Sequence, residues 1–134
     1  MSPRVSFSFT KLRVGDLAGL AKFYTSVCGF AEKARIEVEH GLDGNPVSEV
    51  VLGTGEGGAD LVLISYHGTQ PQPQTEAELG MTTDDLDDFL KRARSAGAKI
   101  IMDPVNAEHG EIRFRAALLT DPEGHMIEAV QYLP

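Results

Sequence analysis

One carboxylate interrupts an apolar alternation near the end of the chain, in the stretch DPEGHMIEAVQ at residues 121–131. The Asp, Pro and Gly at its start predict a tight turn, and a strand follows from Met126. Because side chains alternate between the two faces of a strand, Glu128 shares one face with Met126 and Val130. If that face lines a cleft, Glu128 is a candidate catalytic acid/base or a polar anchor. The alternative is a structural carboxylate that hydrogen-bonds a Tyr or Arg.

Two arginines lie on one face of the preceding stretch EIRFRAALL, residues 111–119. Either Arg113 or Arg115 can neutralise Glu128 or hold a substrate carboxylate with two N–H donors. The alternative is an edge strand whose charges point outward and discourage pairing with another sheet. We place Arg115 in the predicted binding site.

The composition is that of an ordinary globular protein. The 134 residues are 42% hydrophobic and 24% charged, and the formal net charge is −8. This charge argues against nucleic-acid and acidic-membrane partners, which need clustered Lys and Arg, and favours a small organic ligand, cationic ones included. Cys28 is the single cysteine, so no intramolecular disulfide can form. The N-terminal stretch has no apolar signal core or membrane span, which predicts a cytoplasmic location.

The order of the predicted elements repeats, which sets the fold class. Alternation and turn residues predict strands at 5–14, 31–39, 47–53 and 59–66 in the first half and at 77–83, 99–105, 112–121 and 125–133 in the second. Helical spacing predicts one helix in each half, at 15–30 and 84–99. When the two halves are aligned by their helices, the predicted N-caps Asp16 and Asp85 occupy the same position. Each helix is expected to end near a glycine, Gly29 or Gly97.

The sequence therefore predicts an α+β fold of two βαβββ modules. The modules span residues 1–67 and 78–134, and a linker rich in Pro and Gln, residues 68–77, joins them within a single structural domain. We expect an eight-stranded cleft or incomplete barrel, with the helices outside.

The stretches TKLRVGDLAGLAKFYTSVCGF, residues 10–30, and LLTDPEGHMIEAVQ, residues 118–131, resemble the vicinal oxygen chelate superfamily. This superfamily includes glyoxalase I, bleomycin-resistance proteins, extradiol dioxygenases and methylmalonyl-CoA epimerase. The resemblance implies the duplicated fold and a homodimer, sometimes with halves exchanged between subunits. It leaves the chemistry open, because the superfamily contains lyases, epimerases, oxygenases and drug-binding proteins.

The resemblance also implies where a metal would be held. In glyoxalase I of the bacterial type the four ligands are His, Glu, His and Glu, and the matching positions here are Phe9, Leu63, Glu78 and Glu128. Only Glu128 keeps the ligand type. Because two carboxylates without imidazole suit Zn, Ni or Fe poorly, we expect no resident metal. A hard divalent ion held by Glu78, Glu128 and waters is the alternative left open.

Apolar side chains then replace metal ligands in the predicted site. We expect an organic ligand to contact Phe7, Phe9, Leu61, Leu63 and Met126, with Glu78, Arg115 and Glu128 as polar groups. The predicted function is a glyoxalase-like lyase or isomerase with a degenerate metal site, in which Glu128 is the acid/base. The alternative is a protein of the bleomycin-resistance type that sequesters an aromatic or cationic compound without catalysis. The histidines, His40, His67, His109 and His125, are expected at the surface because they lie beside turns or at strand ends.

Overall fold

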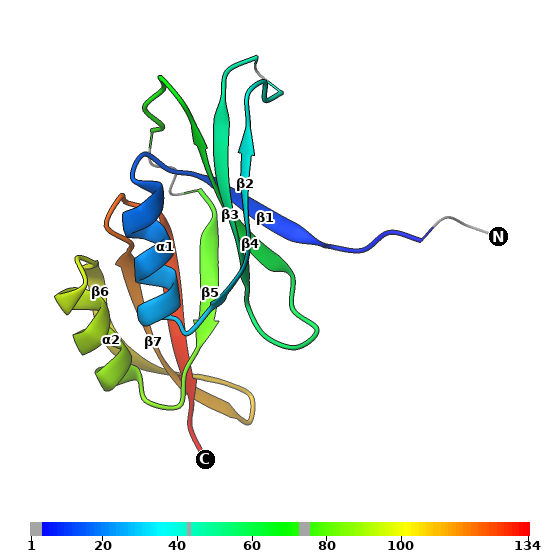
Figure 1. The fold of residues 1–134 in the computed structure, drawn as a ribbon. Coiled ribbons are helices and arrows are strands. Elements are labelled where there is room, and N and C mark those ends of the chain that lie inside the picture. The colour runs from blue at the N-terminus through cyan, green and yellow to red at the C-terminus, as the bar shows by residue number, and fades with distance from the viewer. Residues whose placement is uncertain (1–3, 43, 73–75) are drawn as a thin grey trace. The chain divides into compact units, whose positions relative to one another are not determined.

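The computed structural model describes residues 4–42, 44–72 and 76–134 (Figure 1). Contacts divide the chain into two compact units, residues 1–71 (unit 1) and 72–134 (unit 2). The elements of unit 1 are β1 Phe9–Arg13, α1 Leu17–Ser26, β2 Ala31–Val38, β3 Val47–Gly53 and β4 Asp60–Tyr66. Those of unit 2 are β5 Glu78–Thr82, α2 Leu86–Ser95, β6 Lys99–His109, β7 Ile112–Thr120 and β8 Met126–Tyr132.

Each unit contains a four-stranded mixed sheet with the same topology. The strand order is β1-β4-β3-β2 in unit 1 and β5-β8-β7-β6 in unit 2. The first strand of each unit pairs in parallel with the last strand, and all other neighbours are antiparallel. The predicted α+β fold of two βαβββ modules is therefore confirmed. Three residues of the predicted linker, 73–75, lie outside the described residues.

A capped helix covers one face of the sheet in unit 1. The Asp16 carboxylate accepts a hydrogen bond from Gly19 N at 3.0 Å, which satisfies one of the unpaired N–H groups of the first helical turn. Helical spacing then aligns the apolar side chains of α1 on the face toward the sheet. The buried residues are Leu20, Ala21, Phe23 and Tyr24 on α1, and Val50, Leu52, Leu61 and Leu63 on the sheet.

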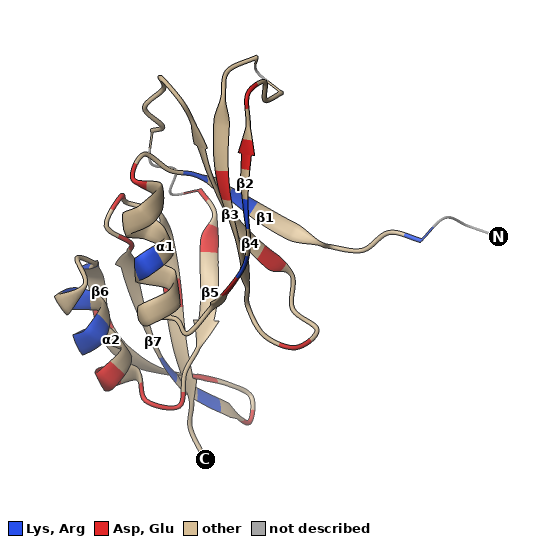
Figure 2. Cartoon of the chain, in the orientation of Figure 1, with Lys and Arg blue, Asp and Glu red and all other residues tan. Residues whose placement is uncertain are grey.

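Unit 2 repeats this arrangement. Asp85 caps α2 by accepting from Asp88 N at 3.0 Å, so both predicted N-caps are confirmed. Figure 2 shows the charges along α2, where Asp87 and Asp88 lie in the first turn and Arg92 and Arg94 in the last, as the helix dipole favours. The buried residues are Leu86, Phe89, Leu90 and Ala93 on α2, and Ala117, Leu119, Ile127 and Ala129 on the sheet.

The alternation of side chains along each strand gives every sheet two faces. We call the face with the buried residues named above the helix-covered face and the opposite one the helix-free face. Core side chains fill the helix-covered faces, so the helix-free faces are the candidates for binding a ligand.

Two strands differ from their predicted bounds. β6 continues to His109 instead of ending near residue 105, and Pro104 lies within it. A proline is tolerated there because β6 is an edge strand, and the pairing of β6 with β7 shifts register between Met102 and Val105. β1 begins at Phe9, not at residue 5. Of the helices in the described ranges, neither has the length and apolar character needed to cross a membrane.

Candidate functional site

The helix-free face of unit 2 contains the predicted acid/base residue. Glu128 on β8 pairs with Gly80 on β5 and with Leu118 on β7, so these three residues form one row across the sheet. Glu128 is partly buried. Within residues 4–42, 44–72 and 76–134, its carboxylate has no ion-pair or hydrogen-bond partner. Within these ranges, no ion pair or hydrogen bond therefore fixes the direction of the carboxylate.

The missing side chain of Gly80 leaves space beside Glu128. A Cβ added at Gly80 would meet no atom within 4 Å, and the backbone there does not have a positive φ. Conformation and packing therefore do not require glycine at this position. Because Gly80 has no side chain, the side of Glu128 that faces β5 is open.

Two further predicted site residues lie on the same face as Glu128. Glu78 pairs with Met126 in the next row of the sheet, so both flank the row of Gly80 and Glu128. Glu78 is exposed and Met126 partly buried. The structure thus places Glu78, Met126 and Glu128 on one face of the same sheet.

The repeat shows which residue of unit 1 corresponds to Glu128. Lys11, the third residue of β1, pairs with Val62, as Gly80, the third residue of β5, pairs with Glu128. Val62, not Leu63, therefore occupies the position equivalent to Glu128. Likewise Phe9, the first residue of β1, corresponds to Glu78.

The other apolar residues of the predicted site are divided between the two faces of unit 1. Leu61 and Leu63 are 4% and 0% exposed on the helix-covered face, where they form the core beneath α1. Phe9 pairs with Asp60, lies on the helix-free face and is 53% exposed. Phe7 precedes β1 and is 78% exposed. Since a shift of one residue along a strand moves a side chain to the opposite face, Leu63 and Phe9 do not share a surface.

Arg115 lies on the helix-covered face of unit 2, opposite to Glu128. Its guanidinium donates two hydrogen bonds to the Asp87 carboxylate, at 3.2 and 3.1 Å. These hydrogen bonds lower the pKa of Asp87, and Asp87 in turn raises the pKa of Arg115. The side chain of Gln131, which pairs with Arg115, accepts from Leu86 N at 2.9 Å. Arg115 and Gln131 thus hold the start of α2 to the sheet.

His125 is buried, contrary to the prediction that all four histidines lie at the surface. It is 7% exposed, and its Nδ1 lies 2.7 Å from Asp121 Oδ2. The other oxygen of Asp121 accepts from Glu123 N at 2.9 Å and His125 N at 3.1 Å. The pair therefore fixes the turn between β7 and β8 from which the strand of Glu128 starts.

An aromatic group lies farther along the helix-free face of unit 2. The rings of His109 and Phe114 stack with centroids 6.4 Å apart and planes at 17°. Phe114 meets Tyr132 at 6.4 Å with planes at 61°, and these two residues also pair across β7 and β8. Tyr132 is 60% exposed. The sequence pattern did not predict this group, because His109 belongs to the unexpected extension of β6.

The residues present do not fit the four-ligand metal site that the superfamily resemblance implies. Phe9 and Val62 have no lone pair to donate, whichever of Val62 and Leu63 is taken as the second position. In the described parts of the chain, no three His, Cys, Asp or Glu side chains gather as metal ligands. Glu78 and Glu128 are the only donors left at the four positions.

Comparison with known proteins agrees with this fold. A sequence profile of the Glyoxalase/Bleomycin resistance protein/Dioxygenase superfamily matches residues 6–129, and the chain belongs to this superfamily. A search of curated proteins finds no significant match.

Solved structures of this superfamily are similar to nearly the whole chain. A glyoxalase family protein from Bacillus cereus has a TM-score of 0.84 at 17% identity, covering 99% of this chain and 97% of its own. The trypanothione-dependent glyoxalase I of Leishmania major has a TM-score of 0.73 at 25% identity, covering 96% and 87%. A glyoxalase/bleomycin resistance protein/dioxygenase family enzyme from Burkholderia phytofirmans has a TM-score of 0.72 at 19% identity, covering 96% and 100%.

Proposed function

We propose that this chain is a glyoxalase-like enzyme of the lyase or isomerase type that acts on a small carbonyl or thioester compound, with Glu128 as its acid/base. The observation that carries the proposal is the placement of Glu128. Its carboxylate lies on the helix-free face beside Gly80, with no ionic partner in the described ranges, and Leu118 is its apolar neighbour.

The chemistry follows from what a carboxylate can do at this place. Glu128 takes a proton from a carbon next to the substrate carbonyl, and the electron pair of the C–H bond moves to the carbonyl oxygen as an enolate. On an α-hydroxy carbonyl compound, the hydroxyl proton then moves to the enolate oxygen and protonated Glu128 returns its proton to the former carbonyl carbon, which completes an isomerisation without a net change in atoms or electrons. General acid–base catalysis of this kind contributes about 10²–10⁴-fold in rate.

The proposal includes no resident metal, because Phe9 and Val62 cannot be ligands. Glu78 and Glu128 alone would offer a hard divalent ion two carboxylates, with waters as the remaining ligands. A thermal-shift titration with Mg²⁺, Mn²⁺, Ni²⁺ and Zn²⁺ tests this part. We expect that none of these ions raises the unfolding temperature in a saturable way. A saturable rise in the parent protein that is lost in Glu78→Gln would contradict the proposal.

A second function is favoured by a specific observation, the aromatic group of His109, Phe114 and Tyr132 on the same face as Glu128. Rings of this kind stack on flat ligands, and a carboxylate attracts a cation. The alternative proposal is therefore a binding protein of the bleomycin-resistance type that sequesters an aromatic or cationic compound. For either function we propose a homodimer, which light scattering on the purified protein tests.

Mass spectrometry of a metabolite mixture incubated with the protein separates the two functions. For an enzyme we expect product formation that is lost in Glu128→Gln and kept in Glu111→Gln, which removes an exposed carboxylate from the turn between β6 and β7. Retention of a compound without product, weakened in Glu128→Gln, would support sequestration instead. Neither turnover nor retention, or equal results for both variants, would contradict a role for Glu128.

A further inference from the structure

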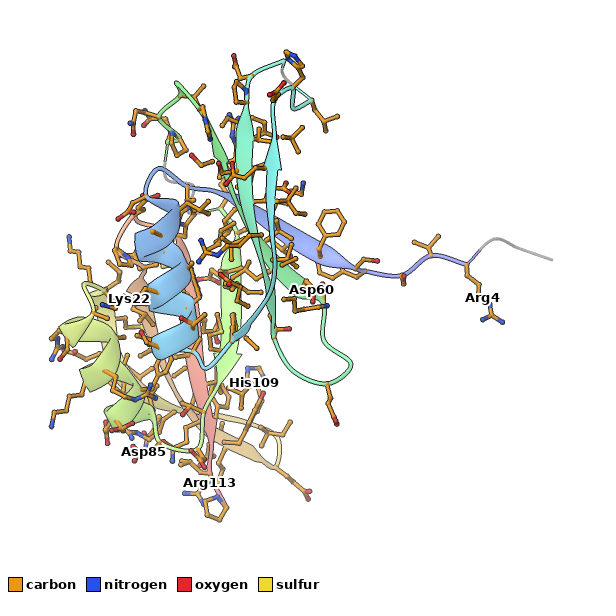
Figure 3. All side chains as sticks on the ribbon, in the orientation of Figure 1. Arg4, Lys22, Asp60, Asp85, His109 and Arg113 are labelled. Atoms are coloured by element: carbon orange, nitrogen blue, oxygen red, sulfur yellow. The ribbon has the colours of Figure 1, made fainter. Side chains whose placement is uncertain are left out.

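The aromatic group of His109, Phe114 and Tyr132 lies on the same face of unit 2 as Glu128, but toward the end of β8. His109, labelled in Figure 3, is the last residue of β6, and Tyr132 is the last residue of β8, four residues after Glu128. Because a strand rises about 3.3 Å per residue, Glu128 and Tyr132 are about 13 Å apart along β8. A compound that contacts both the carboxylate and the rings must therefore be elongated.

The surface between the carboxylate and the rings is apolar. Val130 lies between Glu128 and Tyr132 on this face of β8, and it pairs with Ala116 on β7, which in turn pairs with Val105 on β6. Val105 is 47% exposed, and Val130 is partly buried. The side chains of this row offer no hydrogen bond to a polar group of a ligand, whereas methylene groups gain free energy by leaving water against them. The part of the ligand that crosses this row is therefore expected to be a hydrocarbon chain.

The rings of the aromatic group already contact one another in the two ways that aromatic rings favour. His109 and Phe114 are stacked with planes at 17°, and Phe114 meets Tyr132 at 61°. His109 and Tyr132 are exposed, so part of the group's surface is in contact with water. Offset stacking and edge-to-face contact both stabilise an additional ring on such a surface. The group therefore favours a flat aromatic ring at this end of the ligand.

We propose that the compound on which Glu128 acts is an arylalkyl carbonyl compound, whose ring stacks on His109, Phe114 and Tyr132 about 13 Å from its reacting carbon. Three bonds of an extended chain span about 3.5 Å, so about ten bonds and the radius of the ring bridge this distance. The inference rests on the proposed function of Glu128 and names the substrate class for that site. It concerns unit 2 alone.

Three pyruvamides test the length and the ring separately. In N-(6-phenylhexyl)pyruvamide the ring is about ten bonds from the methyl carbon that carries the acidic protons, in N-benzylpyruvamide it is about half as far, and N-hexylpyruvamide has no ring. NMR titration of ¹⁵N-labelled protein measures their affinities without requiring turnover. We expect the phenylhexyl compound to bind about fivefold or more tightly than either of the others, and to shift the amides of Glu128, Phe114 and Tyr132. Equal affinities, or shifts that leave Phe114 and Tyr132 unmoved, would overturn the proposal.

Matched variants test the role of the aromatic group. Tyr132→Leu removes a ring that is 60% exposed, and Tyr66→Leu is the same substitution at the last residue of β4, the equivalent position in unit 1. Tyr132→Leu should bind the phenylhexyl compound about fivefold more weakly, whereas Tyr66→Leu should bind it as the parent does. His109→Leu is a second variant in the same group and should also weaken binding. Parent affinity in both Tyr132→Leu and His109→Leu, or equal weakening in Tyr66→Leu, would refute the ring site.

Exchange of the methyl protons for solvent deuterium separates a failure of the ring site from a failure of the proposed function. We expect a higher kcat/KM of exchange for the phenylhexyl compound than for the benzyl compound, and a smaller ratio of the two in Tyr132→Leu. Exchange of both compounds with equal kcat/KM would keep Glu128 as the acid/base and overturn the ring site. Ring-dependent binding without exchange, unchanged in Glu128→Gln, would support the ring site and contradict the proposed function.

Discussion

Glu128 and Gly80 pair across β8 and β5, so the carboxylate of unit 2 has an empty position at its side. The equivalent pair in unit 1 is Val62 and Lys11, in which the long side chain crosses the sheet toward Glu49. The two repeats thus differ in charge and side-chain length at equivalent positions. One sheet has a carboxylate on its helix-free face, and the other has a cation above an apolar surface.

Filling the empty position should block the site without harming the fold. Gly80→Val places a branched side chain beside Glu128, on a strand where β-branched residues are favoured. We expect the free energy of unfolding to stay within about 0.5 kcal/mol of the parent or to rise. Ligand retention or turnover should fall, with Gly80→Ala intermediate. Denaturant unfolding and the metabolite assay measure the two effects, and full activity in Gly80→Val would show that this flank is not used.

The face assignment of unit 1 predicts unequal costs for two truncations. Leu63→Ala removes a fully buried side chain beneath α1, so the free energy of unfolding should fall by about 2–5 kcal/mol. Phe9→Ala removes a side chain that is 53% exposed and should cost less than about 1 kcal/mol. Urea unfolding of both variants provides the comparison. A larger loss in Phe9→Ala would mean that the register of β1 on β4 is wrong.

The ion pair of Asp87 and Arg115 predicts a pH dependence of stability. The folded-state pKa of Asp87 is lowered, so its contribution is complete above the ordinary pKa of an aspartate and is lost as the pH falls through the lowered value. We expect Asp87→Asn to unfold at a lower temperature than the parent at pH 7, by a small amount because the pair is exposed. The difference should shrink below about pH 4. Asp84→Asn is the control, and a difference that grows on acidification would contradict the pairing.

Much of the fold was predictable because short stretches of sequence mark the helices and strands of both repeats. Asp16 and Asp85 mark the helix starts by their capping chemistry, and turn residues separate the strands. The extension of β6 through Pro104 was not predictable, since the tolerance for proline depends on β6 lying at the sheet edge.

The candidate site was predictable only for residues on the same strand, because alternation along one strand determines which face of the sheet each side chain occupies. Glu128 and Met126 alternate within β8, so sequence spacing placed them together. The position of Leu63 relative to Phe9 depends instead on the register between β4 and β1, which the sequence does not encode locally. An arginine such as Arg115 is a residue type that suits a binding site. The sequence did not reveal its structural role, because its ion-pair partner Asp87 lies 28 residues away along the chain.

Exchange of carbon-bound hydrogen for solvent deuterium tests the role of Glu128 most directly, because it detects proton abstraction even when no net product accumulates. A panel of small carbonyl compounds and acyl thioesters in D₂O would be followed by ¹H NMR. We predict that the parent protein and Glu111→Gln exchange at least one compound at equal rates, and that Glu128→Gln is slower by about 10²-fold or more. Exchange in Glu128→Gln as fast as in the parent, or none above buffer in the parent, would contradict Glu128 as the acid/base.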